Sequence, residues 1–111
     1  GVTFKENCPD LRNSKKFKII NNLKKYKCEV LITDEFVNQD EAKEVYGVDL
    51  ISVNDIKKVD AVILAVGHDS YKSISISSWE NILVENGILM DIKSLFGKND
   101  FAKSNLKHWR L

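Results

Sequence analysis

The sequence AVILAV at residues 61–66 decides the fold, because it is the most apolar run in the chain. The run is short and lies between Asp60 and Gly67. A continuous apolar run of this length is typical of a strand in a parallel sheet, where helices cover both faces. It therefore predicts a central strand of an α/β fold.

Helical patterns flank this run on both sides. Apolar residues recur at helical spacing over Ser14–Tyr26, over Asn38–Tyr46 and around Ser77–Val84. Asn13 or Ser14 is the predicted N-cap of the first helix. Gly47 is the predicted left-handed C-cap of the second helix, because glycine adopts positive φ without steric cost.

Strand-like segments alternate with these helices. Further strands are predicted over Gly1–Phe4, Cys28–Thr33, Asp49–Val53, Gly87–Ile92 and Leu106–Leu111, with one helical turn over Asn54–Lys58. Strands and helices alternating at this spacing predict a doubly wound α/β fold. We therefore expect a three-layer, Rossmann-like sandwich, with a mostly parallel sheet of about five or six strands and helices on both faces.

Length and composition limit the class of protein. The 111 residues suit a single domain with one core, over residues 1–111. A net charge of +1 gives no bulk attraction to nucleic acid or to an anionic membrane, and no apolar run approaches the length of a membrane helix. Cys8 and Cys28 stand far apart, which favours a reduced, cytoplasmic protein, although a disulfide stays open. The chain starts inside an expected strand without methionine, so we expect a piece of a longer protein.

Four polar loops follow the predicted strands, and ligands of such sheets bind outside the carboxyl ends of the strands. They are Lys5–Arg12, Asp34–Glu35, Gly67–Asp69 and Asp91–Ser94.

Two of these loops place a lysine just beyond an apolar strand. Lys5 follows Phe4, and Lys93 follows Ile92. Two ammonium groups at one edge of a sheet could form a phosphate site, and Phe4 could pack on a sugar or base, but from this pattern alone ordinary surface lysines are favoured.

Several other constellations carry weaker signals. The two cysteines with His68 and His108 lack metal-ligand spacing, so no metal site is predicted. His68 and Asp69 could act as an acid–base pair, but we favour a role in satisfying loop amides. Cys8 could be a nucleophile, but a loop thiol without catalytic duty is favoured. No catalytic residue is therefore assigned within this chain.

The first strand-to-helix loop contains no glycine. A dinucleotide site of this fold requires GxGxxG at that position, so the chain itself is not expected to bind NAD. Within the loop, Asp10 and Arg12 are predicted to organise its conformation, and ligand contact by Arg12 is the competing interpretation.

Three motifs in the same order resemble the carboxy-terminal domain of the UDP-glucose/GDP-mannose dehydrogenase family. The first is GVTFKENCPDLRNS at residues 1–14, similar to the family's Phe-Lys followed by Asp-x-Arg-x-Ser. The second is VDAVILAVGHDSYK, and the third is GILMDIKSLFG, similar to the family's Asp-x-Lys or Asp-Gly-Arg turn. The first motif is closest to the branch that acts on UDP-N-acetylhexosamines.

The resemblance implies a division of labour. An amino-terminal domain of the same chain would bind NAD and carry the catalytic cysteine, while this domain closes over the UDP part of a UDP-sugar. Phe4, Lys5 and Lys93 would contact the nucleotide sugar, and Asp10, Arg12 and Ser14 would hold the loop. The parent enzyme would oxidise a sugar C6 hydroxymethyl group to a carboxylate, as a homo-oligomer.

Two other classes stay open. One is a stand-alone, flavodoxin-like module that binds a nucleotide or regulates another protein. The other is a structural interaction domain whose polar loops serve only solvation.

Overall fold

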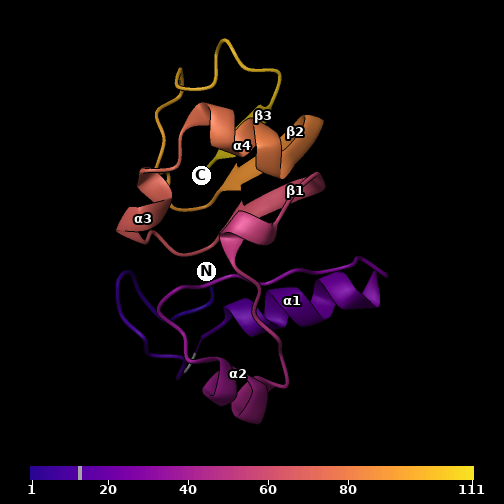
Figure 1. Ribbon diagram of the computed structural model, residues 1–111, viewed down its shortest axis with the longest axis vertical. Helices are drawn as coiled ribbons and strands as arrows, with labels where there is room; N and C mark the ends of the chain where they lie inside the picture. The colour runs from indigo at the N-terminus through magenta and orange to yellow at the C-terminus, as the bar shows by residue number, and fades with distance from the viewer. Residues whose placement is uncertain (13) are drawn as a thin grey trace.

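The computed structural model describes residues 1–12 and 14–111 and confirms an α/β fold with a parallel sheet (Figure 1). Its helices are α1 (Lys16–Lys25), α2 (Gln39–Tyr46), the 3-10 turn η1 (Val53–Asp55), α3 (Asp69–Lys72) and α4 (Ile76–Ile82). Its strands are β1 (Val59–Leu64), β2 (Leu83–Asp91) and β3 (Lys107–Arg110). No helix in the described part of the chain combines the length and the apolar character that crossing a membrane requires.

The sheet has the order β1-β2-β3, and both pairs of strands are parallel. Leu64 at the end of β1 pairs with Asp91 at the end of β2, and Asp91 pairs with Arg110 at the end of β3. The segments that follow β1 and β2 therefore leave the sheet at the same end, where the carboxyl ends of the strands lie. AVILAV does contribute a strand, β1, whose bounds lie two residues earlier, but the prediction that it is central was wrong: β1 is at the edge of the described sheet and β2 is central.

The expected sheet of five or six strands was wrong, because the described sheet has three. The segments at 1–4, 28–33 and 49–53 form no strands. Their backbone groups find other partners: the Val2 and Thr3 amides donate to the Asp34 carboxylate, and the Ile51 amide donates to the Ile32 carbonyl. In the amino-terminal half, a buried carboxylate and isolated backbone bonds thus take the place of a regular ladder.

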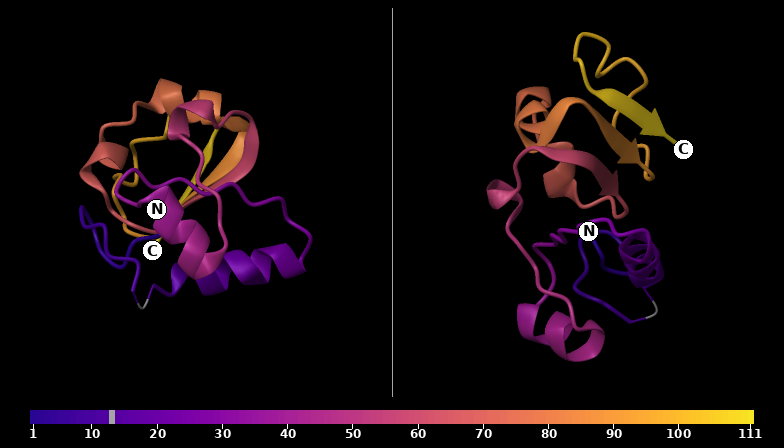
Figure 2. Two further views of the ribbon diagram at one scale, coloured as in Figure 1. Left: turned by 60° about the horizontal axis from the view of Figure 1, so that its bottom comes forward. Right: turned by 90° about the vertical axis from the view of Figure 1, so that its right-hand side faces the viewer.

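Helices cover the two faces of the sheet unequally, which corrects the expected three-layer sandwich. Trp79 and Ile82 of α4 pack with Leu89 of β2 on one face. On the other face, Ile88 and Trp109 are 40% and 46% exposed. Helices α1 and α2 lie beyond the β1 edge of the sheet rather than over β2 and β3 (Figures 1 and 2).

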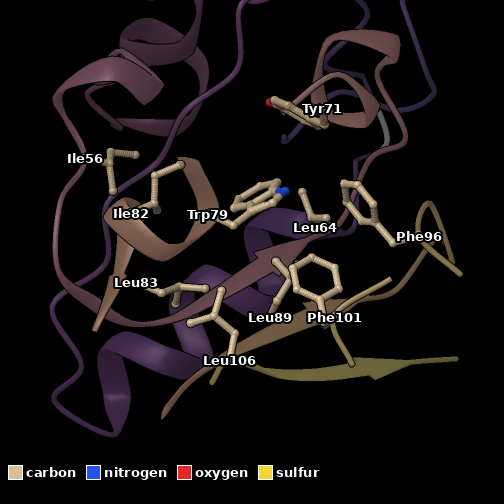
Figure 3. Close-up of a cluster of buried hydrophobic side chains, with 10 residues drawn as sticks. All are labelled: Ile56, Leu64, Tyr71, Trp79, Ile82, Leu83, Leu89, Phe96, Phe101 and Leu106. Carbon is tan, nitrogen blue, oxygen red and sulfur yellow. The ribbon is translucent and has the colours of Figure 1, made fainter. Parts of the chain in front are cut away.

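The apolar core consists of two clusters. The first surrounds the sheet (Figure 3) and comprises Ile56, Leu64, Tyr71, Trp79, Ile82, Leu83, Leu89, Phe96, Phe101 and Leu106. The second lies under α1 and α2 and comprises Val2, Leu11, Phe17, Ile20, Ile32, Ala42 and Val48. Each fully buried large apolar side chain stabilises the fold by about 1.5–3 kcal/mol. The Tyr71 hydroxyl of the first cluster donates to the carbonyl of Thr33, which adjoins Ile32 of the second cluster.

The helix ends agree only in part with the sequence pattern. Gly47 is the C-cap of α2 with φ of 66°, as predicted. The N-cap of α1 is Lys15, which makes no side-chain capping bond, so Ser14 was the wrong choice. The Ser14 hydroxyl donates instead to the Val2 carbonyl at 2.6 Å. The other predicted cap, Asn13, lies outside the described residues.

Candidate functional site

The first residues of the chain are held by one buried carboxylate. Asp34 Oδ2 accepts hydrogen bonds from the amides of Val2 at 2.7 Å and Thr3 at 3.2 Å, and Oδ1 accepts from the Phe36 amide at 3.0 Å. The Asp34 side chain is fully buried. These bonds fix the backbone that leads directly into Phe4.

Hydrogen bonding keeps Asp34 ionised. Burial raises the pKa of its carboxyl, because a charge is poorly solvated inside a protein. Hydrogen bonds from His68 and from the Val2 amide stabilise the anion and outweigh burial, so the pKa lies below its ordinary value. The site therefore contains a buried negative charge that is matched by donors.

The side-chain donor to Asp34 is His68, in the loop of residues 67–69, and it is completely buried. Its Nε2 lies 3.0 Å from each oxygen of Asp34, and its Nδ1 accepts from the Asn7 amide at 2.9 Å. The predicted role in satisfying a loop amide agrees with this contact. The proposed acid–base partner does not, because Asp69 is exposed and pairs with Lys72.

Phe4 and Lys5 lie in the exposed part of the amino-terminal loop, residues 4–10, which we call the crest. Phe4 is 53% exposed, so its ring is accessible from solvent. Its amide donates to the Asp10 carbonyl at 2.7 Å, so the crest is closed by a backbone bond. Both side chains are free to meet a ligand from solvent.

Lys93 follows β2 in a tight turn. The Asp91 carboxylate accepts from the amides of Leu95 at 2.9 Å and Phe96 at 3.0 Å, and from His108 Nε2 at 3.1 Å. Ser94 adopts a positive φ of 52°. The turn directs Lys93 away from the core, and its side chain is 41% exposed.

The structure brings Lys93 to the amino-terminal loop, next to Glu6. The Lys93 ammonium lies 3.5 Å from Glu6 Oε1, and Glu6 adjoins Lys5 in the chain. Gly67 makes this approach possible: a Cβ there would lie 3.1 Å from the Glu6 side chain and equally close to Leu95. A backbone bond from its own amide, and then the Lys93 charge, lower the pKa of Glu6.

Sequence reasoning missed a third cation at this edge. The Lys16 ammonium donates to the Phe4 carbonyl at 3.3 Å. Partial burial lowers the pKa of Lys16, and the nearby Lys93 charge lowers it further. Nothing in the sequence marks Lys16 among the many lysines of α1; only the packing of the helix start under the loop does. We call Phe4, Lys5, Lys16 and Lys93 the cationic edge.

The three residues expected to organise the loop make local contacts. The Arg12 guanidinium bonds both oxygens of Asp10, at 3.1 and 3.2 Å, and the Arg12 amide donates to Asp10 at 2.9 Å. This pair is exposed and raises the pKa of Arg12, first through the hydrogen bond and then through the Asp10 charge. Ser14 is buried and bonds the Val2 carbonyl. Together they fix the return of the chain towards α1.

The remaining chemical groups show no assembled site. Cys8 and Cys28 are free thiols. In residues 1–12 and 14–111, no group of three potential metal ligands comes together. A cavity of about 450 Å³ lies on the far side of Asp34, lined by Glu35, Ser52 and Tyr71 among others, but not by the cationic edge.

Comparison with known proteins identifies the family of the chain. Residues 1–98 match the family model of the UDP-glucose/GDP-mannose dehydrogenase family, UDP binding domain. The chain belongs to this family. Within it, the chain is the UDP-binding domain.

Individual relatives agree with this family. Protein CapL from Staphylococcus aureus is 40% identical over 111 residues, which is 100% of this chain and 26% of the relative. A UDP-N-acetyl-D-glucosamine 6-dehydrogenase from Salmonella typhi is 38% identical over 84% of this chain and 22% of the relative. The enzyme of that name from Pseudomonas aeruginosa is 35% identical over 96% of this chain and 25% of the relative. The chain thus spans about a quarter of the length of these curated relatives.

Proposed function

We propose that the cationic edge binds the UDP part of a UDP-sugar in a longer nucleotide-sugar 6-dehydrogenase. The observation that carries this proposal is the contact between Lys93 and Glu6, which brings two family motifs from opposite ends of the chain to one place. Lys5 and Lys93 offset the negative charge of the diphosphate, and the exposed Phe4 ring packs beside the ligand. Lys16 adds positive potential and holds the Phe4 carbonyl.

The role of this domain is to position the substrate. Binding energy gained at the diphosphate holds the reacting sugar in place at a distant centre, which raises the rate without any chemical step on this chain. The reaction is oxidation of the sugar C6 hydroxymethyl group to a carboxylate. The catalytic cysteine belongs to another domain, because Cys8 does not match its motif.

The residues of this chain do not fit NAD as a bound cofactor. The loop between Phe4 and Lys15 lacks the glycines of a dinucleotide site. A pyrophosphate needs a backbone cradle at that position. NAD is therefore assigned to the preceding domain of the same protein.

The names of two relatives support a UDP-N-acetylhexosamine as substrate, and CapL supports a role in polysaccharide precursor synthesis. The parent protein is proposed to be a cytoplasmic homo-oligomer. Its partners are the UDP-sugar and its own NAD domain.

The test is Lys5→Ala in the full-length protein that carries this chain. The KM for UDP-N-acetylglucosamine should rise about tenfold or more, because one charge-assisted phosphate contact is lost. The KM for NAD should not change. Lys18→Ala, an exposed lysine on α1, is the matched control and should leave both values unchanged. An unchanged KM for the UDP-sugar in Lys5→Ala would contradict the proposal.

A stand-alone nucleotide-binding module makes a different prediction. The 111-residue chain would then bind UDP tightly without any preceding domain, and calorimetry would detect it. Under the proposed function, binding by the chain alone is weak, because the other wall of the site is missing.

A further inference from the structure

The segment that carries Phe4 and Lys5 has no strand partner to hold it. Its backbone is fixed at Val2 and Thr3 by Asp34, and at Asn7 by His68 Nδ1. These bonds lie on both sides of Phe4 and Lys5. A single buried Asp34–His68 pair therefore holds the segment from either end.

The hydrogen-bond network assigns the tautomer of His68. The Asn7 amide is a donor, so the Nδ1 that lies 2.9 Å from it must be a bare acceptor. Nε2 then carries the hydrogen and donates to the Asp34 carboxylate at 3.0 Å. The contacts of Nε2 are buried and include Thr3 Oγ1 at 3.4 Å, whereas the Nδ1 bond to Asn7 is partly buried.

A reciprocal bond makes the contact with Asn7 specific. The Asn7 side-chain oxygen accepts from the Asp69 amide at 3.0 Å, while the Asn7 amide donates to His68. Asn7 adopts a left-handed φ of 54°, which asparagine tolerates better than most residues. The two loops are thus clasped by two bonds running in opposite directions.

Aromatic packing fixes the imidazole plane. The His68 ring lies 4.5 Å from the Phe36 ring and 5.2 Å from the Tyr71 ring, measured between centroids. Phe36 follows Asp34 and Tyr71 lies in α3, so neither belongs to the amino-terminal loop that carries Asn7. The ring therefore cannot turn to exchange its partners without repacking the junction between the two apolar clusters.

We infer that His68 is a positioning residue for UDP-sugar binding, and that it acts through its Nδ1 bond to Asn7 to hold Phe4 and Lys5 in their binding conformation. This inference rests on the proposed function of the cationic edge. His68 itself touches no substrate, since it is completely buried. It is distinct from Lys5 in that its removal disorders the loop without removing a ligand contact.

Two isosteric variants of the full-length protein separate the two bonds. In His68→Asn, the amide oxygen can take the place of Nδ1 and accept from Asn7. In His68→Gln, the amide nitrogen can take the place of Nε2 and donate to Asp34, but the acceptor for Asn7 is lost. A residue that merely fills the core would give equal effects in both variants.

The expected result is a rise of about tenfold in the KM for UDP-N-acetylglucosamine for His68→Gln and of less than about threefold for His68→Asn. The KM for NAD should be unchanged in both. Hydrogen exchange over residues 2–10 should become faster in His68→Gln than in His68→Asn. Ile82→Ala, in the core under α4, is the control that lowers stability without touching the loop, and its KM values should equal those of the unmodified protein.

Equal KM values in the two His68 variants, or a similar rise in Ile82→Ala, would overturn the inference. Lys5→Ala separates this failure from that of the proposed function. If Lys5→Ala raises the KM and the His68 variants do not, His68 has no positioning role but the site stands. If Lys5→Ala has no effect, the proposed function fails, and the inference fails with it.

Discussion

Two buried aspartate–histidine pairs lie behind the two halves of the cationic edge, and they do different work. Asp34 and His68 join segments 34 residues apart and hold a loop that has no secondary structure. Asp91 and His108 lie on adjacent strands and finish a turn that the sheet already places. The first pair fixes the backbone of the amino-terminal loop, whereas the second stabilises a turn whose position the strands already determine.

The partners of the two histidines show the same contrast. Both nitrogens of His68 are bonded, to Asp34 and to the Asn7 amide. For His108 the structure gives one bond, from Nε2 to Asp91, and the ring packs 4.8 Å from Phe101. Both rings pack against aromatic side chains, so the difference between the two histidines is the second hydrogen-bonded nitrogen of His68, which reaches a distant loop.

The largest effect is expected from removing the two carboxylates. Asp34→Ala leaves three backbone amides and His68 without an acceptor, so the free energy of unfolding should fall by about 3 kcal/mol or more. Asp91→Ala strands two amides within one turn and should cost about 2 kcal/mol. Urea denaturation measures both. Equal losses would remove the distinction between the pairs, and exposed Asp49→Ala should be silent.

Low pH should destabilise the fold through the Asp34–His68 pair. The pKa of Asp34 is lowered on folding, so its contribution to stability is present above its unfolded pKa and is lost as pH falls through the lower folded value. Below about pH 4 the chain should therefore lose stability. Asp34→Asn should flatten this part of the curve of unfolding midpoint against pH. A curve unchanged by Asp34→Asn would show that other carboxyls dominate.

A moderate effect should distinguish the two lysines. Lys93→Arg introduces a planar fork that can bond Glu6 and a phosphate together, so the KM for UDP-N-acetylglucosamine should fall by about two- to threefold in the full-length protein. Lys5 lies near the Asp10 carboxylate, but Arg12 already occupies that group, so Lys5→Arg should give no gain. Steady-state kinetics of both variants would test this. A gain in Lys5→Arg but not in Lys93→Arg would reverse the assignment.

The smallest effect is expected from Arg12→Ala. Its ion pair with Asp10 is exposed and local, and such pairs add little to stability. The unfolding midpoint should stay close to that of the unmodified chain. A large fall would mean that the Asp10–Arg12 pair holds the loop as strongly as Asp34 does.

The sequence pattern predicted the sheet side of the molecule well. AVILAV and GILMDI contain enough apolar residues to mark buried strands, and parallel pairing then brings their ends together. The closeness of Lys93 to the first loop did not follow from strand pairing, because residues 1–4 form no strand. Gly47 was found because a helix that ends in the left-handed region needs glycine.

The amino-terminal half was predicted less well, for a physical reason. CEVLIT has the composition of a strand, but composition does not reveal that Asp34 takes the amides of Val2 and Thr3 as partners. Such bonds depend on residues more than thirty positions apart. The pairing of His68 with Asp34 rather than with its neighbour Asp69 was hidden for the same reason.

The clasp around Asn7 also bears on the order of folding. Its partners come 61 and 62 residues later in the chain, so the crest cannot be fixed until a long loop has closed. Contacts of such large sequence separation form slowly. We therefore expect UDP binding to return in the last phase of refolding, after the fluorescence of buried Trp79 has recovered. If the proposed function holds, the loop that carries Phe4 and Lys5 is the part of the domain that is fixed last.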